Sequence, residues 1–269
     1  MKSTGIKNTF RSLKYRNFRL FFGGQSLSLI GTWIQRIALP WLVYDQTNSA
    51  FILGVVGFLG QLPTFLLAPF AGVISDRFNK YHLLIATQVL SMIQASILAV
   101  LVLSGHIQIW QIFLLSAVLG TINAFDVPTR QSFMIRMVDK KEDLGNAIAL
   151  NSTMVNAARL LGPSIAGILI ATAGEGICFL INAISYLFVI GSLVAMRIEP
   201  RKRVAASKPM ITELKEGFSY TFKFIPLRNT LILLALVSLV GMPYTVLIPV
   251  FVKEVLGGGS HTFGFLMGA

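Results

Sequence analysis

Long apolar stretches alternate with short polar connections along this chain. Seven of the stretches have the roughly 20 residues that a helix needs to cross the ~30 Å hydrocarbon core of a bilayer. They cover residues 20–44, 51–74, 81–103, 107–126, 147–172, 176–196 and 229–252, and an eighth opens near residue 260. The pattern predicts an all-α, polytopic membrane protein.

The composition agrees with a membrane protein. Of the 269 residues, 54% are hydrophobic and 13% are charged, and the mean hydropathy is +0.71. In a soluble protein, the formal net charge of +12 would suggest a nucleic-acid partner. Here the basic residues are concentrated between the apolar stretches. We therefore expect them to interact with the lipid bilayer and not with nucleic acid.

Lys and Arg are distributed unevenly over the connections. The N-terminal residues 1–19 hold six of them, and the connections 75–82, 127–146 and 197–228 hold two, four and eight. The intervening connections hold only Lys253. The positive-inside rule therefore predicts a cytoplasmic N-terminus in a multi-pass protein of the cell (inner) membrane.

The chain also contains a weak internal repeat, whose matched positions within the spans lie at offsets of 209 and 210 residues. The matches are Arg16-Asn17 with Arg228-Asn229, Pro40 with Pro249, Tyr44-Asp45 with Lys253-Glu254, and Leu53-Gly54 with Phe263-Gly264. Such a repeat indicates a duplicated six-helix unit. We expect a six-helix transmembrane bundle over residues 1–196, a cytoplasmic linker over 197–228, and the first one to two helices of an incomplete second bundle over 229–269.

The linker contains a helical pattern of its own. Beyond Pro209, apolar residues recur at helical spacing with charged residues between them. This pattern predicts an amphipathic helix on the membrane surface that joins the two bundles. A regulatory partner site is the alternative.

Enzymatic chemistry finds little support in the sequence. His82, His106 and His261 all fall at the ends of apolar stretches, with no carboxylate at ligand spacing, and Cys178 is the single cysteine. These residues form no metal-ligand or nucleophile pattern, so we assign no catalytic residue, metal or cofactor.

Polar residues inside the spans are costly in hydrocarbon and need a partner or a watery cavity. Most of them recur at helical steps in the first and fifth spans, and one lies in the fourth. The candidate cavity-lining and substrate-binding residues are Gln25, Ser28, Thr32, Gln35, Arg36, Asn123, Asn156 and Arg159. The alternative is that the uncharged ones only form hydrogen bonds between helices.

The two arginines within spans allow a sharper hypothesis. Arg36 could reach the headgroups by extending its side chain along the helix. Arg159 lies near the middle of its span, so we expect it to face a cavity or a carboxylate. Because Asp45, Glu175 and Asp126 all lie near span ends, the sequence assigns no protonation site.

A short charged turn joins the second and third spans. It reads Gly72-Val-Ile-Ser-Asp76-Arg77-Phe-Asn-Lys80 and resembles the loop signature of the major facilitator superfamily, although that signature favours glycine where this chain has Asn79. The resemblance implies two six-helix bundles that expose a central site to each side of the membrane in turn. It also implies that Gly72, Asp76, Arg77 and Lys80 form a conformational lock.

A second motif, Gly162-Pro163-Ser-Ile-Ala-Gly167, lies in the fifth span. Glycines allow close helix contact, and proline bends a helix, either as a hinge or as a static kink. The motif resembles the signature of major facilitator exporters that work as antiporters, with Ala158 and Ala166 in place of two glycines.

The stretch Asp126-Val-Pro-Thr-Arg130-Gln and the opening Arg16-Asn-Phe-Arg resemble the enterobactin-exporter and transmembrane secretion effector branch. This resemblance implies proton-coupled export of amphipathic small molecules, such as drugs or siderophore-like compounds. Residues 107–125 lack the arginine that many drug/proton antiporters carry in the fourth span. An importer of the same superfamily, or a truncated half-transporter with a binding role, are the alternatives.

Overall fold

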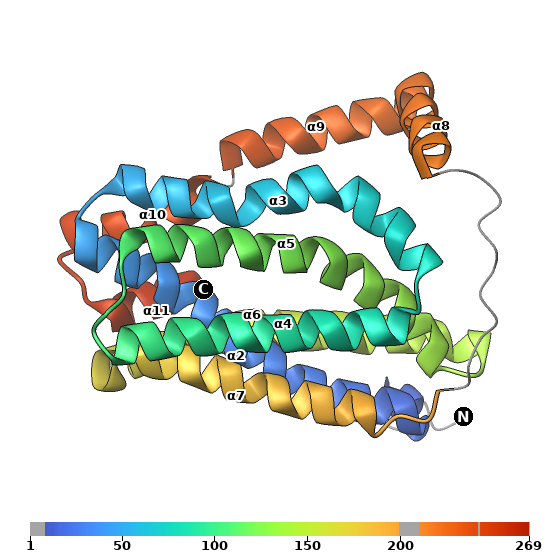
Figure 1. Ribbon diagram of the computed structural model, residues 1–269, viewed down its shortest axis with the longest axis horizontal. Coiled ribbons are helices and arrows are strands. Elements are labelled where there is room, and N and C mark those ends of the chain that lie inside the picture. The colour runs from blue at the N-terminus through green and yellow to red at the C-terminus, as the bar shows by residue number, and fades with distance from the viewer. Residues whose placement is uncertain (1–8, 199–209, 242, 269) are drawn as a thin grey trace, which may run out of the picture.

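The computed structural model describes residues 9–198, 210–241 and 243–268, apart from the side chains of residues 76, 210, 213, 214, 218, 239 and 243. Throughout these ranges all regular structure is helical (Figure 1). The α-helices are α2 (Arg16–Thr47), α3 (Ala50–Arg77), α4 (Lys80–Leu103), α5 (Ile109–Met134), α6 (Lys141–Ala173), α7 (Glu175–Val194), α8 (Met210–Lys223), α9 (Ile225–Gly241), α10 (Pro243–Glu254) and α11 (Ser260–Gly268). There are also two 3-10 helices in these ranges: η1 (Arg11–Lys14) precedes α2, and η2 (Ile135–Met137) lies between α5 and α6.

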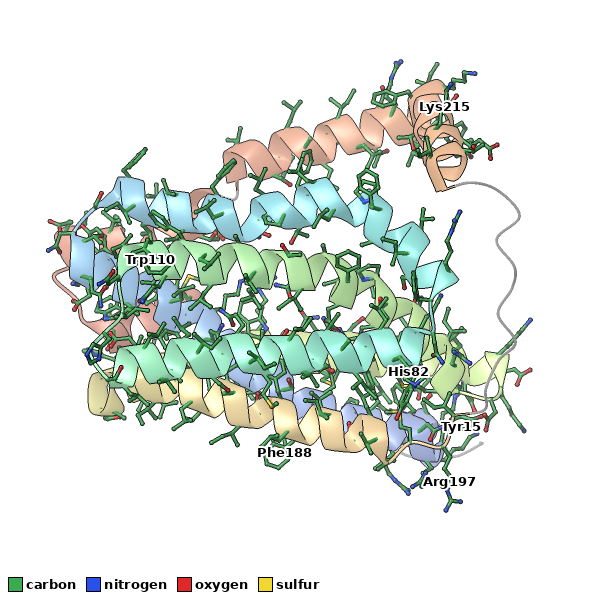
Figure 2. The ribbon with its side chains drawn as sticks, viewed as in Figure 1. Tyr15, His82, Trp110, Phe188, Arg197 and Lys215 are labelled. Carbon is green, nitrogen blue, oxygen red and sulfur yellow. The ribbon has the colours of Figure 1, made fainter. Side chains whose placement is uncertain are left out.

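Helices α3 to α7 are each long and apolar enough to cross a membrane. Helix α2 is not among them, because its polar residues lower its hydropathy, yet it packs against α6 and α7 within the bundle. Large apolar side chains such as Phe188, which is 53% exposed, point away from the helices (Figure 2). The prediction of an all-α, multi-pass membrane protein is confirmed.

The bundle has two ends, which differ in charge. We call the end that holds Tyr15, His82 and Arg197 the basic end, and the end that holds Trp110 the opposite end (Figure 2). The helices run between these ends and pack mainly as α2 with α7 and α6, α4 with α7 and α5, and α3 with α5.

Small residues bring neighbouring helices together in the bundle. A Cβ added at Gly31 of α2 would lie 2.4 Å from the Ser185 hydroxyl of α7, and one added at Gly120 of α5 would lie 2.3 Å from the Gly60 carbonyl oxygen of α3. Van der Waals packing and interhelical hydrogen bonds, rather than exclusion from water, hold helices together in lipid. These close approaches therefore decide which helices are neighbours.

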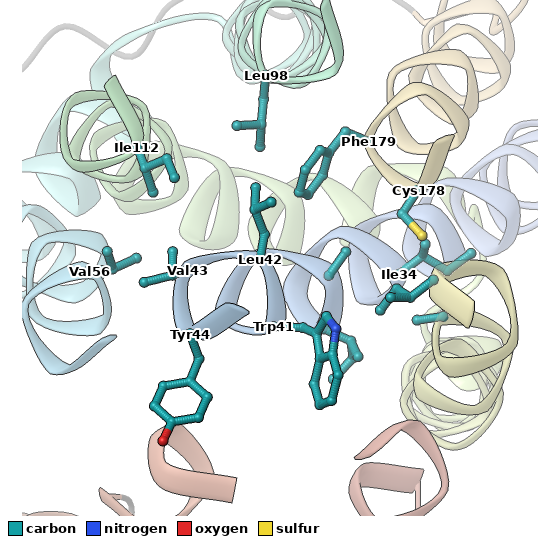
Figure 3. Close-up of a cluster of buried hydrophobic side chains, with 14 of the residues drawn as sticks. Ile34, Trp41, Leu42, Val43, Tyr44, Val56, Leu98, Ile112, Cys178 and Phe179 are labelled. Atoms are coloured by element: carbon teal, nitrogen blue, oxygen red, sulfur yellow. The ribbon is translucent and has the colours of Figure 1, made fainter. Parts of the chain in front are cut away.

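Two clusters of buried apolar side chains form the core. One lies nearer the basic end and includes Phe18, Phe133 and Val189. The other lies toward the opposite end, where Leu98 and Phe179 point toward Leu42 (Figure 3). This second cluster also contains Val252 of α10 and Phe263 of α11, so segments of the predicted second unit share a core with the first six helices.

Helices α9 and α10 together cover the span expected over 229–252, and Met242, which lies between them, is outside the described residues. The single span therefore stays a prediction. Helix α10 packs against α2, α3 and α11, whereas α9 packs against α8, which lies in the segment predicted as the amphipathic linker.

Residues 11–15 bind to the first turn of α6 at the basic end. The Asp143 carboxylate forms ion pairs with Arg11 (2.8 Å) and Lys14 (2.6 Å), and it accepts a hydrogen bond from the Tyr15 hydroxyl (2.7 Å). The hydrogen bond between them raises the pKa of Lys14 and lowers the pKa of Asp143, so this pair is intact at neutral pH. It is lost in alkali, where Lys14 loses its proton, and in acid, where Asp143 gains one. These contacts anchor η1 beside the connection between α5 and α6.

Candidate functional site

The backbones of α6 and α11 touch. A Cβ added at Gly264 would lie 2.5 Å from the Pro163 carbonyl oxygen and 2.7 Å from the Gly167 Cα atom. One added at Gly167 would lie 2.8 Å from the Ser260 carbonyl oxygen, and the Ser260 hydroxyl donates a hydrogen bond to the Gly167 carbonyl (3.3 Å). Close contact at the glycine motif was predicted, but its partner was not: the motif lies between the first six helices and α11.

The other side of the same motif packs against α2. A Cβ added at Gly162 would lie 2.4 Å from the Trp33 Cβ atom. The Trp33 ring in turn contacts two guanidinium groups, with the Arg36 Cζ atom 4.8 Å and the Arg159 Cζ atom 6.0 Å from its centroid. Both arginines are exposed. The structure thus brings together the two arginines that the sequence placed in separate spans.

At the opposite end, four residues join the first unit to the second. The Tyr44 hydroxyl donates a hydrogen bond to Glu254 (2.9 Å), and Lys253 forms an ion pair with Asp45 (2.5 Å). We call Tyr44, Asp45, Lys253 and Glu254 the clasp. Figure 3 shows Tyr44 pointing toward the C-terminal helices. These are the repeat-related pairs of the sequence, and each residue contacts the counterpart of its neighbour, as expected across a pseudo-twofold axis.

An aromatic contact strengthens the same junction. The Trp41 ring of α2 stacks on the Phe263 ring of α11, with centroids 5.6 Å apart and planes inclined by 22°. The Lys253 ammonium lies 5.3 Å from the Trp41 centroid. Aromatic stacking and cation–π contacts each contribute about 0.5–1.5 kcal/mol beyond the area they bury. These contacts therefore hold α2 against α10 and α11 at the opposite end.

Gln35 lies inside the first bundle. The Gln35 amide donates a hydrogen bond to Gln94 of α4 (3.1 Å) and accepts one from Asn182 of α7 (2.8 Å). The Gln94 amide donates to the Leu115 carbonyl of α5 (3.3 Å). This geometry matches the interhelical alternative that the sequence left open for the uncharged polar residues.

We expect Gln35→Leu to lower the free energy of unfolding by about 1–3 kcal/mol, because it removes two buried hydrogen bonds and takes one partner each from the Gln94 and Asn182 amides. Thermal unfolding in detergent, followed by the fluorescence of a dye that reacts with Cys178 as it becomes exposed, measures the loss. Gln61→Leu, at an exposed position of α3, is the matched control and leaves the midpoint unchanged. Equal midpoints for both variants would refute the network's role.

The remaining polar candidates divide between the bundle interior and its surface. Gln25 and Ser28 are buried, and Thr32 is half-buried and donates to the Ser28 carbonyl of its own helix (2.8 Å). Asn123 and Asn156 are exposed, on α5 and α6. Their roles in lining a cavity stay predictions.

At the turn between α3 and α4, Asn79 has a clear structural role. Its side-chain oxygen accepts a hydrogen bond from the Tyr81 backbone N–H (3.0 Å) and so caps α4. This explains how the turn forms without the glycine of the superfamily signature. Gly72, Arg77 and Lys80 are half-buried there, whereas the Asp76 carboxylate belongs to the part that the structure does not describe, so the lock stays a prediction.

Asp126 is more deeply buried than its position near the end of a predicted span indicates. It is only 6% exposed, and its carboxylate accepts hydrogen bonds from Thr87 (2.9 Å) and Gln88 (2.6 Å) of α4. Arg130 forms an ion pair with it (3.4 Å) one turn along α5. The neighbouring residues Thr87 and Gln88 on a predicted membrane helix were the available signal, but only the packing of α4 on α5 shows what they bind.

The bundle of long apolar helices defines the chain as a multi-pass helical membrane protein. Residues 7–269 match the family described as "Transmembrane secretion effector", and the chain belongs to this family of transporters, which are not enzymes. The resemblance inferred from the motifs is therefore confirmed.

Several known transporters are similar to this chain. The Staphyloferrin A transporter of Staphylococcus aureus is 30% identical over 250 residues, covering 93% of this chain and 62% of that protein. Macrolide efflux protein A of Streptococcus pyogenes is 24% identical over 257 residues, covering 91% and 62%. Multidrug efflux pump Tap of Mycolicibacterium fortuitum is 25% identical over 216 residues, covering 77% and 52%. The chain thus spans less than two thirds of the length of these relatives.

Proposed function

We propose that this chain is part of a secondary active transporter that exports amphipathic small molecules, drug-like or siderophore-like, from the cell. The observation that carries this proposal is the junction at the opposite end, where the clasp and the α6–α11 contact join the two units. A junction that closes one end between two repeat-related units is one of the two states that alternating access requires. Two of the relatives named above carry the word efflux in their names, which supports export.

The same proposal includes an orientation and a driving force. The excess of Lys and Arg at the basic end supports a cytoplasmic N-terminus, with the clasp on the outer side. The antiporter-like motif at Gly162 and Pro163 supports exchange of the solute for protons. Asp126 is the carboxylate that we assign to proton binding, because it is a buried acidic residue between α4 and α5 and Arg130 is paired with it one turn further along α5.

A reversible cross-link tests the proposal. In the double variant Asp45→Cys, Lys253→Cys of the complete gene product, a short reducible thiol-specific linker is expected to stop efflux of a fluorescent drug from proteoliposomes. Reducing agent is then expected to restore it, because alternating access requires the clasp to open in each cycle. The native Cys178 is buried and gives little background labelling. Efflux at an unchanged rate after complete cross-linking would contradict the proposal.

A further inference from the structure

Trp33, Arg36 and Arg159 form a compact cationic group, which we call the arginine pair site. The two guanidinium groups come from different helices and share one indole ring, at 4.8 Å and 6.0 Å from its centroid. Both arginines are exposed, and among the residues that the structure describes neither forms an ion pair with a carboxylate. The sequence alone allows Arg159 to face either a carboxylate or a cavity.

The arginine pair site lies well within the membrane-crossing length of its helices. With a rise of about 1.5 Å per residue, Arg36 is roughly 16 Å from the end of α2 and Arg159 roughly 21 Å from the end of α6. These depths are too great for either guanidinium to reach water readily at the opposite end. Charged groups at such a depth are expensive unless they face a polar space or a counter-ion.

The site also faces the junction between the two units. Trp33 and Tyr44 are 11 residues apart on α2, about three turns, so they share one face of the helix. Tyr44 belongs to the clasp, and Arg159 is one turn before Pro163, whose carbonyl contacts Gly264 of α11. The arginine pair site therefore lies on the basic-end side of the contacts that close the opposite end, where a transported solute would be held.

Two positive charges held at one ring repel each other, and the indole offsets this only in part. An anion between them would remove the repulsion. Guanidinium groups present pairs of N–H donors whose spacing matches the two oxygens of a carboxylate, so each can bind one carboxylate through two hydrogen bonds. Two acidic residues beyond the end of this site nearest the clasp, Asp45 and Glu254, are already engaged with Lys253 and Tyr44.

We infer that the arginine pair site binds the anionic part of the exported molecule, and that the substrates are carboxylate-bearing amphiphiles rather than cationic drugs. This inference rests on the proposed export function and names the substrate class of the same transporter. The ligand is a soluble carboxylate. An anionic lipid headgroup has similar chemistry, and binding of such a lipid in place of the solute would contradict the inference.

Binding of a matched pair of probes tests the inference. Dansyl-glutamate carries two carboxylates, and its diamide has the same shape without charge. With the complete gene product in phosphatidylcholine nanodiscs, fluorescence anisotropy is expected to show tighter binding of the acid. Arg36→Gln and Arg159→Gln are each expected to weaken binding of the acid about tenfold or more, and to leave the diamide unchanged. Arg19→Gln, exposed on the same α2, is the control and keeps wild-type affinity.

Further outcomes would overturn the inference. These are equal affinity of the wild type for both probes, no loss in either variant, or an equal loss for acid and diamide, which would mean a structural role. If phosphatidylglycerol in the nanodiscs raises thermal stability in an Arg159-dependent way and the acid does not bind, the site holds lipid instead. Should Arg159→Gln fail to fold, Arg36→Gln decides the question.

Failure of the export proposal can be told apart from failure of the anion site. If the complete protein moves neither probe across proteoliposomes, export fails, while nanodisc binding still decides the arginine pair site. If it exports the diamide and ignores the acid, export stands and the anion site fails.

Discussion

Gly264→Leu is expected to abolish transport while leaving the first six helices folded. Even the first added carbon would lie 2.5 Å from the Pro163 carbonyl oxygen and 2.7 Å from the Gly167 Cα atom. Both obstacles are backbone atoms, which cannot rotate away, so α11 must separate from α6. Because this contact helps to close the opposite end, the transporter loses that closed state. The measurement is the efflux rate of the complete gene product in proteoliposomes.

The matched control for this substitution is Gly191→Leu. Gly191 is exposed on α7, and a Cβ added there meets nothing within 4 Å. The same side chain at that site is expected to leave the efflux rate and thermal stability unchanged. Normal efflux by the Gly264→Leu protein would show that the α6–α11 contact is not part of the transport cycle.

Asp126→Asn is expected to separate efflux from the proton gradient. The amide oxygen still accepts hydrogen bonds from Thr87 and Gln88, so the packing of α4 on α5 is retained. An amide cannot take up and release a proton, so uphill efflux stops and the residual, downhill flux no longer responds to a protonophore. Flux in proteoliposomes with an imposed pH gradient, with and without protonophore, measures the effect.

Two further variants serve as comparisons for Asp126→Asn. Asp139→Asn, at an exposed position of the same end, is expected to behave as the wild type. Asp126→Leu leaves Thr87, Gln88 and Arg130 without their acceptor and is expected to cost on the order of 3 kcal/mol of stability. Uphill efflux by Asp126→Asn that still collapses with protonophore would place the proton site elsewhere.

Local pattern made much of the fold predictable. The apolar stretches at 51–74 and 81–103 became α3 and α4, because a run of that length and hydropathy has few alternatives to a membrane helix. The roles of the linker and of the lock residues stay predictions.

The candidate site was harder to predict, because residue type does not show which way a helix faces. Gln35 and Arg36 are neighbours on one polar stripe, yet Gln35 is buried against α4 and α7 while Arg36 is exposed beside Trp33. The direction of each side chain depends on which helices surround α2. Asp126 was underestimated for the same reason, since its burial comes from α4.

The sequence by itself determined that this is an all-α membrane protein and showed its weak internal repeat, since hydropathy and matched positions such as Tyr44 and Lys253 are properties of the chain alone. Only the tertiary structure decided that Tyr44 and Lys253 belong to one clasp, that Gly167 meets Gly264, and that Arg36 and Arg159 share Trp33. In lipid, helices associate through close packing and a few polar contacts, and these depend on surface shape in three dimensions, which residue spacing does not specify.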